Sequence, residues 1–270
     1  MLRDITIGQY FPGTSVVHRT APRLKLVLVI AMIVTLFLAS GPVSYALLAL
    51  YILTVIKISG IQPKMVVRGL KPVVFIVAFT ALLNLFYTPG TELWSFGFLH
   101  ITDQGIRVAI LMVVRILLLI IGTSMLTYTT SPIELTDGLE MLLSPFKKVH
   151  LPVHELAMMM SIALRFIPTL IEETEKIIAA QKARGADFES GNLVQRARAM
   201  VPILVPLFIS AFRRADELAI AMECRLYRGD VGRTRMKQMK LGSVDVLTGT
   251  VSVVVFAAVI VLGRFGWGSV

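Results

Sequence analysis

The sequence predicts an all-α membrane protein with about five transmembrane helices and a large cytoplasmic or interfacial coupling-helix segment between the fourth and fifth spans. Three observations favour this fold class. The 270 residues are 56% hydrophobic, with a mean hydropathy of +0.77, which is too apolar for an ordinary soluble domain. Long windows of the chain carry no charge at all. Residues 131–243, in contrast, hold 16 of the 27 basic and 13 of the 17 acidic residues.

The first charge-free window covers residues 26–56, and Gly41-Pro42 interrupts it as a turn would. At about 1.5 Å per residue the window is about 46 Å long, against a hydrocarbon core of about 30 Å. It is therefore either one overlong tilted helix or two short ones. Basic residues flank both ends, and basic flanks favour the cytoplasm. We therefore expect a hairpin of two short spans, at about 26–40 and 42–56.

Further spans are expected at about 72–91, at 108–130 and over the apolar run 246–263. The connector 88–106 holds two acidic residues and no lysine or arginine, so we place it outside the cell. This order predicts a multi-pass protein of the cell membrane, embedded in the lipid bilayer, with a cytoplasmic N-terminus and an extracellular C-terminus. The chain then has three regions, namely transmembrane residues 1–130, cytoplasmic coupling residues 131–243, and the last transmembrane helix with the C-terminus, 244–270.

The coupling region contains apolar runs that charges and prolines keep too short to span a membrane. We expect helices in the inner interface or beneath the transmembrane helices, with Pro168, Pro202 and Pro206 as kinks or breaks. The run Met158-Met159-Met160 has two interpretations. It is either core filler or an adaptable apolar surface that accepts more than one partner helix.

Two stretches of this region end in the same way, 41 residues apart. "IIAAQKARG" and "AIAMECRL" align so that Ala183 matches Cys224 and Arg184 matches Arg225. Gly185 stands where the left-handed residue of a helix C-cap belongs. An arginine at one helix end could merely complement the helix dipole. Two matched ends favour a pair of docking tips, because a guanidinium can bind a carboxylate through two parallel hydrogen bonds.

Several classes of function are disfavoured by what the sequence holds. The net charge of +10 suggests nucleic acid, but in so apolar a chain basic residues more often mark cytoplasmic faces. The single cysteine, Cys224, allows no internal disulfide and no multi-cysteine zinc site. No glycine is followed by lysine, so the chain has no Walker A loop and no ATP site of that kind. We expect no catalytic residue, no metal site and no cofactor.

The sequence lacks the motifs of two membrane-bound proteases. A zinc metalloprotease needs His-Glu-x-x-His, but Met158 follows His154-Glu155 at that spacing. An intramembrane protease of the Glu-Glu-x-x-x-Arg type would need arginine where Ile177 stands. An ion-coupled secondary carrier remains the alternative, and Arg115 is the charged residue inside a span that could serve it. The other interpretation of Arg115 is a snorkelling or internally hydrogen-bonded side chain.

Nearly the whole chain resembles the transmembrane T component (EcfT) of energy-coupling factor (ECF) transporters, ABC-type vitamin importers, and in particular the shared-module type. The resemblance is carried by "GQYFPGTSVVHRTAPRLKL" (8–26), by "SPIELTDGLEMLLSPFKKVHLPVHELAMMMSIALRFIPTLIEETEKIIAAQKARGADF" (131–188) and by "VPLFISAFRRADELAIAMECRLY" (205–227). Cys224 and Leu226 depart from the usual Ala-Arg-Gly pattern of the second tip, and Ala21 stands where the family often has aspartate.

The resemblance implies a subunit that does no chemistry itself. Two ATPase subunits would dock on the arginine tips, close on ATP and move both coupling helices. These helices would reorient a separate substrate-binding membrane subunit, the S component, for uptake of a vitamin or similar micronutrient. The implied ATPase-docking residues are Ala183, Arg184, Gly185, Cys224, Arg225 and Leu226. The residues expected to form the seat of the S component are Met158, Met159, Met160, Ile203 and Leu207.

Overall fold

The computed structural model describes residues 10–96, 99–149, 152–188, 192–229 and 242–264. The described chain forms two compact units. The first, called here the helix bundle, comprises residues 10–142 together with the last helix, 242–264. The second, called here the crossed-helix unit, comprises the described residues between 143 and 229. Each unit is described by itself.

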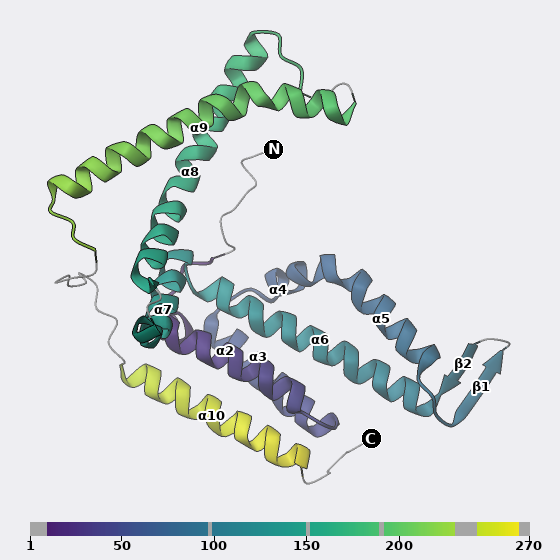
Figure 1. The fold of residues 1–270 in the computed structure, drawn as a ribbon. Coiled ribbons are helices and arrows are strands. Elements are labelled where there is room, and N and C mark those ends of the chain that lie inside the picture. Colours follow the sequence, from purple (N-terminus) through teal and green to yellow (C-terminus); the bar gives the residue numbers. More distant parts are fainter. Residues whose placement is uncertain (1–9, 97–98, 150–151, 189–191, 230–241, 265–270) are drawn as a thin grey trace. The chain divides into compact units, whose positions relative to one another are not determined.

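The helix bundle follows the order of the chain from its first short helix to its last long one. Helices α2, α3, α6 and α10 lie side by side in it (Figure 1). Its elements are α1 (Val16–Arg19), α2 (Pro22–Leu38), α3 (Pro42–Ser59), α4 (Pro63–Leu70), the 3₁₀ turn η2 (Lys71–Val73), α5 (Val74–Tyr87), β1 (Glu92–Phe96), β2 (Leu99–Thr102), α6 (Asp103–Thr129), α7 (Pro132–Leu143) and α10 (Ser243–Arg264).

The hairpin predicted within the first charge-free window is confirmed, because α2 and α3 are two separate helices. The turn depends on Gly41, whose φ of +91° lies in the left-handed region that side chains other than glycine's rarely adopt. Proline at the first position of α3 suits a helix start, where no backbone N–H is needed.

The connector between α5 and α6 differs from a plain loop. It folds into an antiparallel β-hairpin of β1 and β2, which the charge pattern did not predict. The following helix, α6, then begins at Asp103, five residues before the expected span. The Thr102 hydroxyl caps it by accepting a hydrogen bond from Gly105 N at 2.9 Å. A Cβ on Gly105 would lie 2.9 Å from the Leu85 carbonyl, so glycine permits the close approach of α5 and α6.

The core of the bundle lies between α2, α3, α6 and α10. Leu36 and Leu48 are completely buried there, as is Val259 of α10. Gly122 of α6 provides the space for Met32, whose side chain would overlap any Cβ at that position. Polar side chains also join the helices, since Tyr51 and Ser252 share a hydrogen bond of 2.8 Å between their hydroxyls.

A buried aspartate fastens the last helix to the start of α2. The Asp245 carboxylate, 5% exposed, accepts hydrogen bonds from Ala21 N at 2.6 Å and from Gly242 N at 2.8 Å. Nearby, the Lys25 ammonium donates to Thr129 O at 2.9 Å and to the Thr130 hydroxyl at 3.1 Å. These contacts satisfy groups whose burial without partners would be costly. Position 21 is alanine in this chain, whereas the family often has aspartate there. The carboxylate that accepts from Ala21 N is that of Asp245 in α10.

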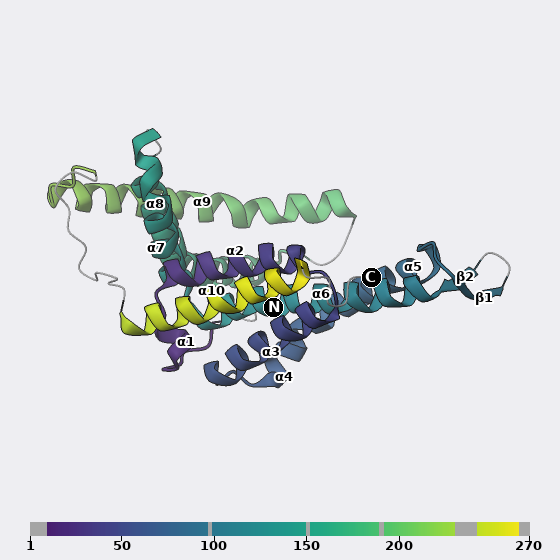
Figure 2. The same cartoon turned by 90° about the horizontal axis from the view of Figure 1, so that it is seen from below.

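The crossed-helix unit consists of the 3₁₀ segment η3 (Ser144–Val149) and two long helices, α8 (Val153–Ala183) and α9 (Leu193–Cys224). The two long helices cross one another in both views (Figures 1 and 2). Pro168, Pro202 and Pro206 all lie inside these helices. Of the two expectations, kinks or breaks, the prolines therefore do not break the helices. Kinks stay a prediction, because each proline leaves one carbonyl without its intrahelical donor.

The all-α membrane class is confirmed, with the small β-hairpin as its one addition among the described residues. Six helices are long and apolar enough to cross a membrane by length and composition. Four of them correspond to expected spans, and the other two are α8 and α9, the least apolar of the six. The remaining expected span, 26–40, corresponds to helix α2, which has 17 residues and is not among the six. The six are Pro42–Ser59, Pro63–Tyr87, Asp103–Thr129, Val153–Ala183, Val194–Cys224 and Ser243–Arg264.

Candidate functional site

The first tip, formed by Ala183, Arg184 and Gly185, is a regular C-terminal cap of α8. Gly185 has a φ of +86°, as the sequence predicted for a left-handed cap residue. Beyond it, Ala186 N donates to Gln181 O at 3.0 Å. This bond and that from Gly185 N to Lys182 O, also 3.0 Å, form a Schellman motif. The motif satisfies carbonyls that the helix end would otherwise leave without donors.

The second tip, formed by Cys224, Arg225 and Leu226, repeats this geometry 41 residues later. Tyr227 N donates to Met222 O at 3.0 Å, and Leu226 N donates to Glu223 O at 2.8 Å. Leu226 takes the place of glycine and adopts a φ of +58°. A bulky residue is strained in this region. The second tip therefore has the same backbone shape as the first in spite of its different residues.

Both tips are open to a partner. All six of their residues are exposed. In the part of the chain that the structure describes, neither the Arg184 nor the Arg225 guanidinium makes an ion pair. Each guanidinium therefore remains available for a carboxylate or a carbonyl of another protein, next to a small side chain that keeps the tip narrow.

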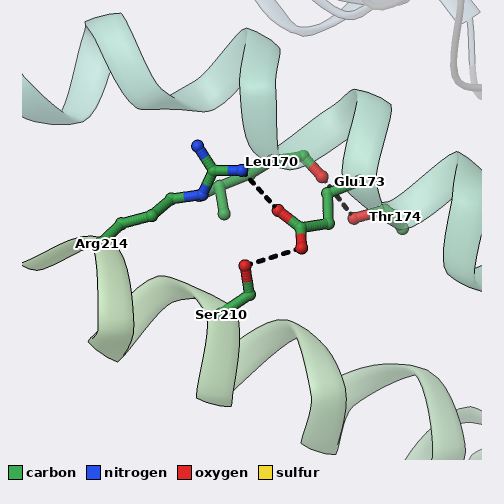
Figure 3. A network of polar contacts seen from close by, with 5 residues as sticks. All are labelled: Leu170, Glu173, Thr174, Ser210 and Arg214. Carbon is green, nitrogen blue, oxygen red and sulfur yellow. Dashed lines mark hydrogen bonds and ion pairs between the residues drawn. The ribbon is translucent and has the colours of Figure 1, made fainter.

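The crossing of α8 and α9 is held by a polar contact that the sequence analysis did not single out. Glu173 of α8 accepts a hydrogen bond from the Ser210 hydroxyl at 2.6 Å and another from Arg214 Nη2 at 2.8 Å (Figure 3). The Ser210 bond, together with the Arg214 bond and charge, holds the pKa of the Glu173 carboxyl below its ordinary value. The 41-residue offset between the two helices was the signal that could have revealed this contact, because it also separates Glu173 from Arg214.

The expected seat residues do not share one exposed surface. Met159 is 53% exposed, and Met158 and Met160 are partly exposed. Ile203, in contrast, is buried at 7% and Leu207 is only partly exposed. Both lie at helical spacing from Ser210 and Arg214, on the stripe of α9 that faces α8. Ile203 as a seat residue stays a prediction, and its burial makes Met159 the more accessible of the expected residues.

The opposite stripe of α9 is apolar and exposed. Its residues recur at spacings of three and four, with Leu204 and Val205 adjacent, which places them on one helix face. Each of them is between 46% and 68% exposed. This surface, called here the exposed α9 stripe, comprises Val201, Leu204, Val205, Phe208 and Phe212.

Arg115 has an internal role in the bundle. Its Nε donates to the Tyr45 hydroxyl at 2.7 Å, and its guanidinium lies 5.9 Å from the ring centroid of Phe37 and 5.6 Å from that of Tyr45. These aromatic rings favour a cation. The interpretation of Arg115 as an internally hydrogen-bonded side chain is thus confirmed, and the geometry gives no support to a carrier.

Comparisons with known proteins show which proteins this chain is similar to. The family of cobalt transport proteins, CbiQ, matches residues 13–237. An energy-coupling factor transporter transmembrane protein EcfT of Ruminiclostridium cellulolyticum is 55% identical over 262 residues, which are 97% of this chain and 98% of the relative. The protein of the same name from Thermosediminibacter oceani is 54% identical, covering 98% of this chain and all of the relative. That of Bacillus subtilis is 48% identical, covering 96% of this chain and 98% of the relative.

Proposed function

Since this chain belongs to the EcfT family, the energy-coupling factor transporter transmembrane proteins, we propose that it is the coupling subunit of a vitamin or micronutrient importer. In this proposal the chain catalyses no reaction. It receives ATP-driven motion from two ATPase subunits and passes that motion to a separate substrate-binding membrane subunit, the S component.

One observation carries the proposal, namely that two long helices end in the same exposed arginine-bearing cap. The hydrogen bonds of the two Schellman motifs correspond at an offset of 41 residues. Both cap residues, Gly185 and Leu226, have positive φ. A dimer of ATPases offers two similar grooves, and two similar tips complement them. Each ATPase then receives one guanidinium, which can bind a carboxylate or carbonyls at the base of its groove.

The S component is proposed to bind Met159 and the exposed α9 stripe, defined above by Val201, Leu204, Val205, Phe208 and Phe212. Apolar helix faces pack against apolar partner helices, and methionine adapts to partners of different shape. A T component that serves several S components needs such adaptability. These surfaces precede the tips along each helix, so partners of different kinds contact different parts of the same two helices.

The proposed topology places the tips in the cytoplasm, where ATP is available. The N-terminus would be cytoplasmic and the C-terminus extracellular, with α8 and α9 in or beneath the inner interface. Their lower hydropathy among the six long helices supports this assignment. Their arginine-bearing, charged ends also favour the cytoplasmic side.

Co-purification of the full chain with its ATPases and an S component tests the proposal. Arg184→Glu is expected to lose the ATPases and keep the S component, because it places a negative charge where a cation docks. Phe208→Asp is expected to do the reverse, because a buried charge without a partner opposes apolar packing.

Two variants serve as matched controls. Arg198→Glu makes the same charge change as Arg184→Glu at an exposed residue of α9 that belongs to neither tip, and is expected to keep both partners. Phe208→Leu keeps the stripe apolar and should also keep both. If no substitution in the tips or the stripe separates the two kinds of partner, the proposed division of surfaces is wrong.

A further inference from the structure

The helix bundle encloses a cavity of about 350 Å³ at the end where α2 begins and where α3 and α6 end. Its walls come from α1, α2, α3, α6 and α10, so the whole cavity lies within one unit. Its floor is formed by buried side chains of the core, among them Met32, Met125 and Phe256. Ile58 of α3 and Val251 of α10 line it and are each 49% exposed, so its mouth lies between these two helices. A volume of this size is typical of ligand pockets.

The polar side chains that line this cavity already have partners within the chain. The Lys25 ammonium donates to three oxygens of the chain at 2.9 to 3.3 Å. The Tyr51 hydroxyl donates to the Ser252 hydroxyl, which itself donates to a carbonyl of α10. The threonines of the lining each donate to the carbonyl four residues earlier, and they are Thr20, Thr54, Thr129 and Thr248. The cavity therefore offers a ligand an apolar surface and no unused buried donor.

Such a lining favours hydrocarbon over water. A buried water needs two to four polar partners, and an empty cavity forfeits the dispersion contacts of its walls. Helices α3, α6 and α10 are long and apolar enough to cross a membrane, so the hydrocarbon available at the mouth is that of lipid acyl chains. The lining of α10 extends from Leu247 to Phe256. This is about 14 Å along the helix, close to half of a hydrocarbon core of about 30 Å, which is the depth of one leaflet.

Exposed basic residues adjoin the lining at the polar end of the cavity. Arg19 directly precedes the lining residue Thr20, and Lys57 directly precedes Ile58 at the mouth. Both are exposed, and α1 packs against α3. Neither makes an ion pair among the described residues. The Asp245 carboxylate at the start of α10 is buried and already accepts from two backbone N–H groups. The exposed charge here is therefore positive, and it attracts anionic headgroups.

We propose that this cavity is a lipid site, which holds one acyl chain of an anionic phospholipid with its phosphate at Arg19 and Lys57. The chain enters between α3 and α10 and reaches the floor at Met32 and Met125. It fills space that the helices leave open, so the bound lipid becomes part of the packing of the bundle. The site includes neither the tips nor the exposed α9 stripe, so it does not depend on the proposed function.

Photo-cross-linking of the full chain in nanodiscs tests the lipid site. The nanodiscs consist of phosphatidylcholine with a small fraction of phosphatidylglycerol whose acyl chain carries a diazirine at its end. After irradiation, mass spectrometry locates the adducts. Met32 and Met125 are 4% and 5% exposed, so only an acyl chain inside the cavity reaches them. Leu50, 65% exposed and outside the lining, reports the surrounding bilayer. We expect adducts at all three residues of the wild-type chain.

Closing the mouth should remove the inner adducts. Val251→Trp places a bulky ring in the mouth and should lower labelling of Met32 and Met125 about fivefold or more, with Leu50 unchanged. Val253→Trp is the matched control, because Val253 is 61% exposed and lies about 200° around α10 from Val251, outside the lining. It should leave the inner adducts unchanged. Should Val251→Trp fail to insert, Thr54→Trp closes the mouth from the α3 side.

A second probe with the same diazirine chain and a phosphatidylcholine headgroup tests the role of the charge. The anionic probe should label Met125 about three- to tenfold more than this zwitterionic probe, and Arg19→Gln/Lys57→Gln should abolish the difference. Lys71→Gln, at an exposed basic residue of η2 outside the lining, should preserve it. Labelling of Leu50 without any adduct at Met32 or Met125 would overturn the lipid site. Equal labelling of Met125 by both probes in the wild-type chain would overturn the assignment of an anionic lipid.

Discussion

The two tips share one backbone shape but differ in the residue that adopts it, so opposite substitutions should have opposite effects. Leu226 has a φ of +58°, and Gly185 has one of +86°. A side chain in this region costs about 1–2 kcal/mol. Glycine is free of that strain but loses about 0.5–1 kcal/mol more backbone entropy on ordering. Leu226 is 76% exposed, so its truncation removes little buried surface. Leu226→Gly should therefore stabilise the second cap by up to about 1 kcal/mol.

The reverse substitution at the first tip should destabilise it by a similar amount. A Cβ on Gly185 would meet no atom within 4 Å, so Gly185→Leu introduces backbone strain without a steric clash. The expected cost is about 1 kcal/mol.

Hydrogen exchange at single amides measures both effects without any partner. Tyr227 N and Ala186 N each close a Schellman motif with a bond of 3.0 Å, so their protection reports the opening of each cap. Leu226→Gly should slow exchange at Tyr227 up to about fivefold, and Gly185→Leu should speed exchange at Ala186 by about the same factor. Leu226→Asn should give a rate of exchange at Tyr227 between those of the wild type and Leu226→Gly, because asparagine tolerates the left-handed region. Faster exchange at Tyr227 in Leu226→Gly would refute the strain argument.

Arg184→Glu or Arg225→Glu should weaken ATPase binding by about 2–5 kcal/mol, measured by interferometry on immobilised chain, because an interface charge is reversed; unchanged affinity would exclude docking at the tips. An impermeant maleimide should label Thr91→Cys in intact cells and miss Lys64→Cys; outside labelling at position 64 would contradict the expected topology. Asp245→Ala should lower the free energy of unfolding by about 2–4 kcal/mol, because two backbone N–H groups lose their buried acceptor. The measurement is the unfolding temperature in detergent, and Asp245→Asn should lower it less.

Local signals predicted the helix ends and turns well, because a single residue type decides them. Gly185 has the positive φ that its position at the helix end suggested, and Gly41 lies in the turn that was predicted there. Arg184 directly follows the end of α8. Leu226 shows the limit of such signals, since the surrounding hydrogen bonds impose a conformation that its own side chain disfavours.

Helix faces were harder to predict, because α9 is apolar on both sides. Ile203 and Phe208 are equally hydrophobic, yet one is buried at 7% and the other is 61% exposed. A helix with apolar residues all round gives no periodicity from which to choose its packed face. The polar residues indicate the packed face of α9, because Ser210 and Arg214 lie on it and bond to Glu173 of α8. The contact of Arg214 with Glu173 could not be read from charge alone, because arginine also stands at position 213 and glutamate at 172.

The central claim is that the chain couples ATP hydrolysis to uptake, and transport by the reconstituted complex tests it most directly. The chain is assembled in proteoliposomes with its two ATPases and an S component, and uptake of the tritiated vitamin that this S component binds is measured. The coupling role predicts uptake that needs ATP hydrolysis and is abolished when Arg184→Glu and Arg225→Glu are combined. Uptake by the chain without ATPases, driven by an ion gradient, would contradict the coupling role and support a secondary carrier.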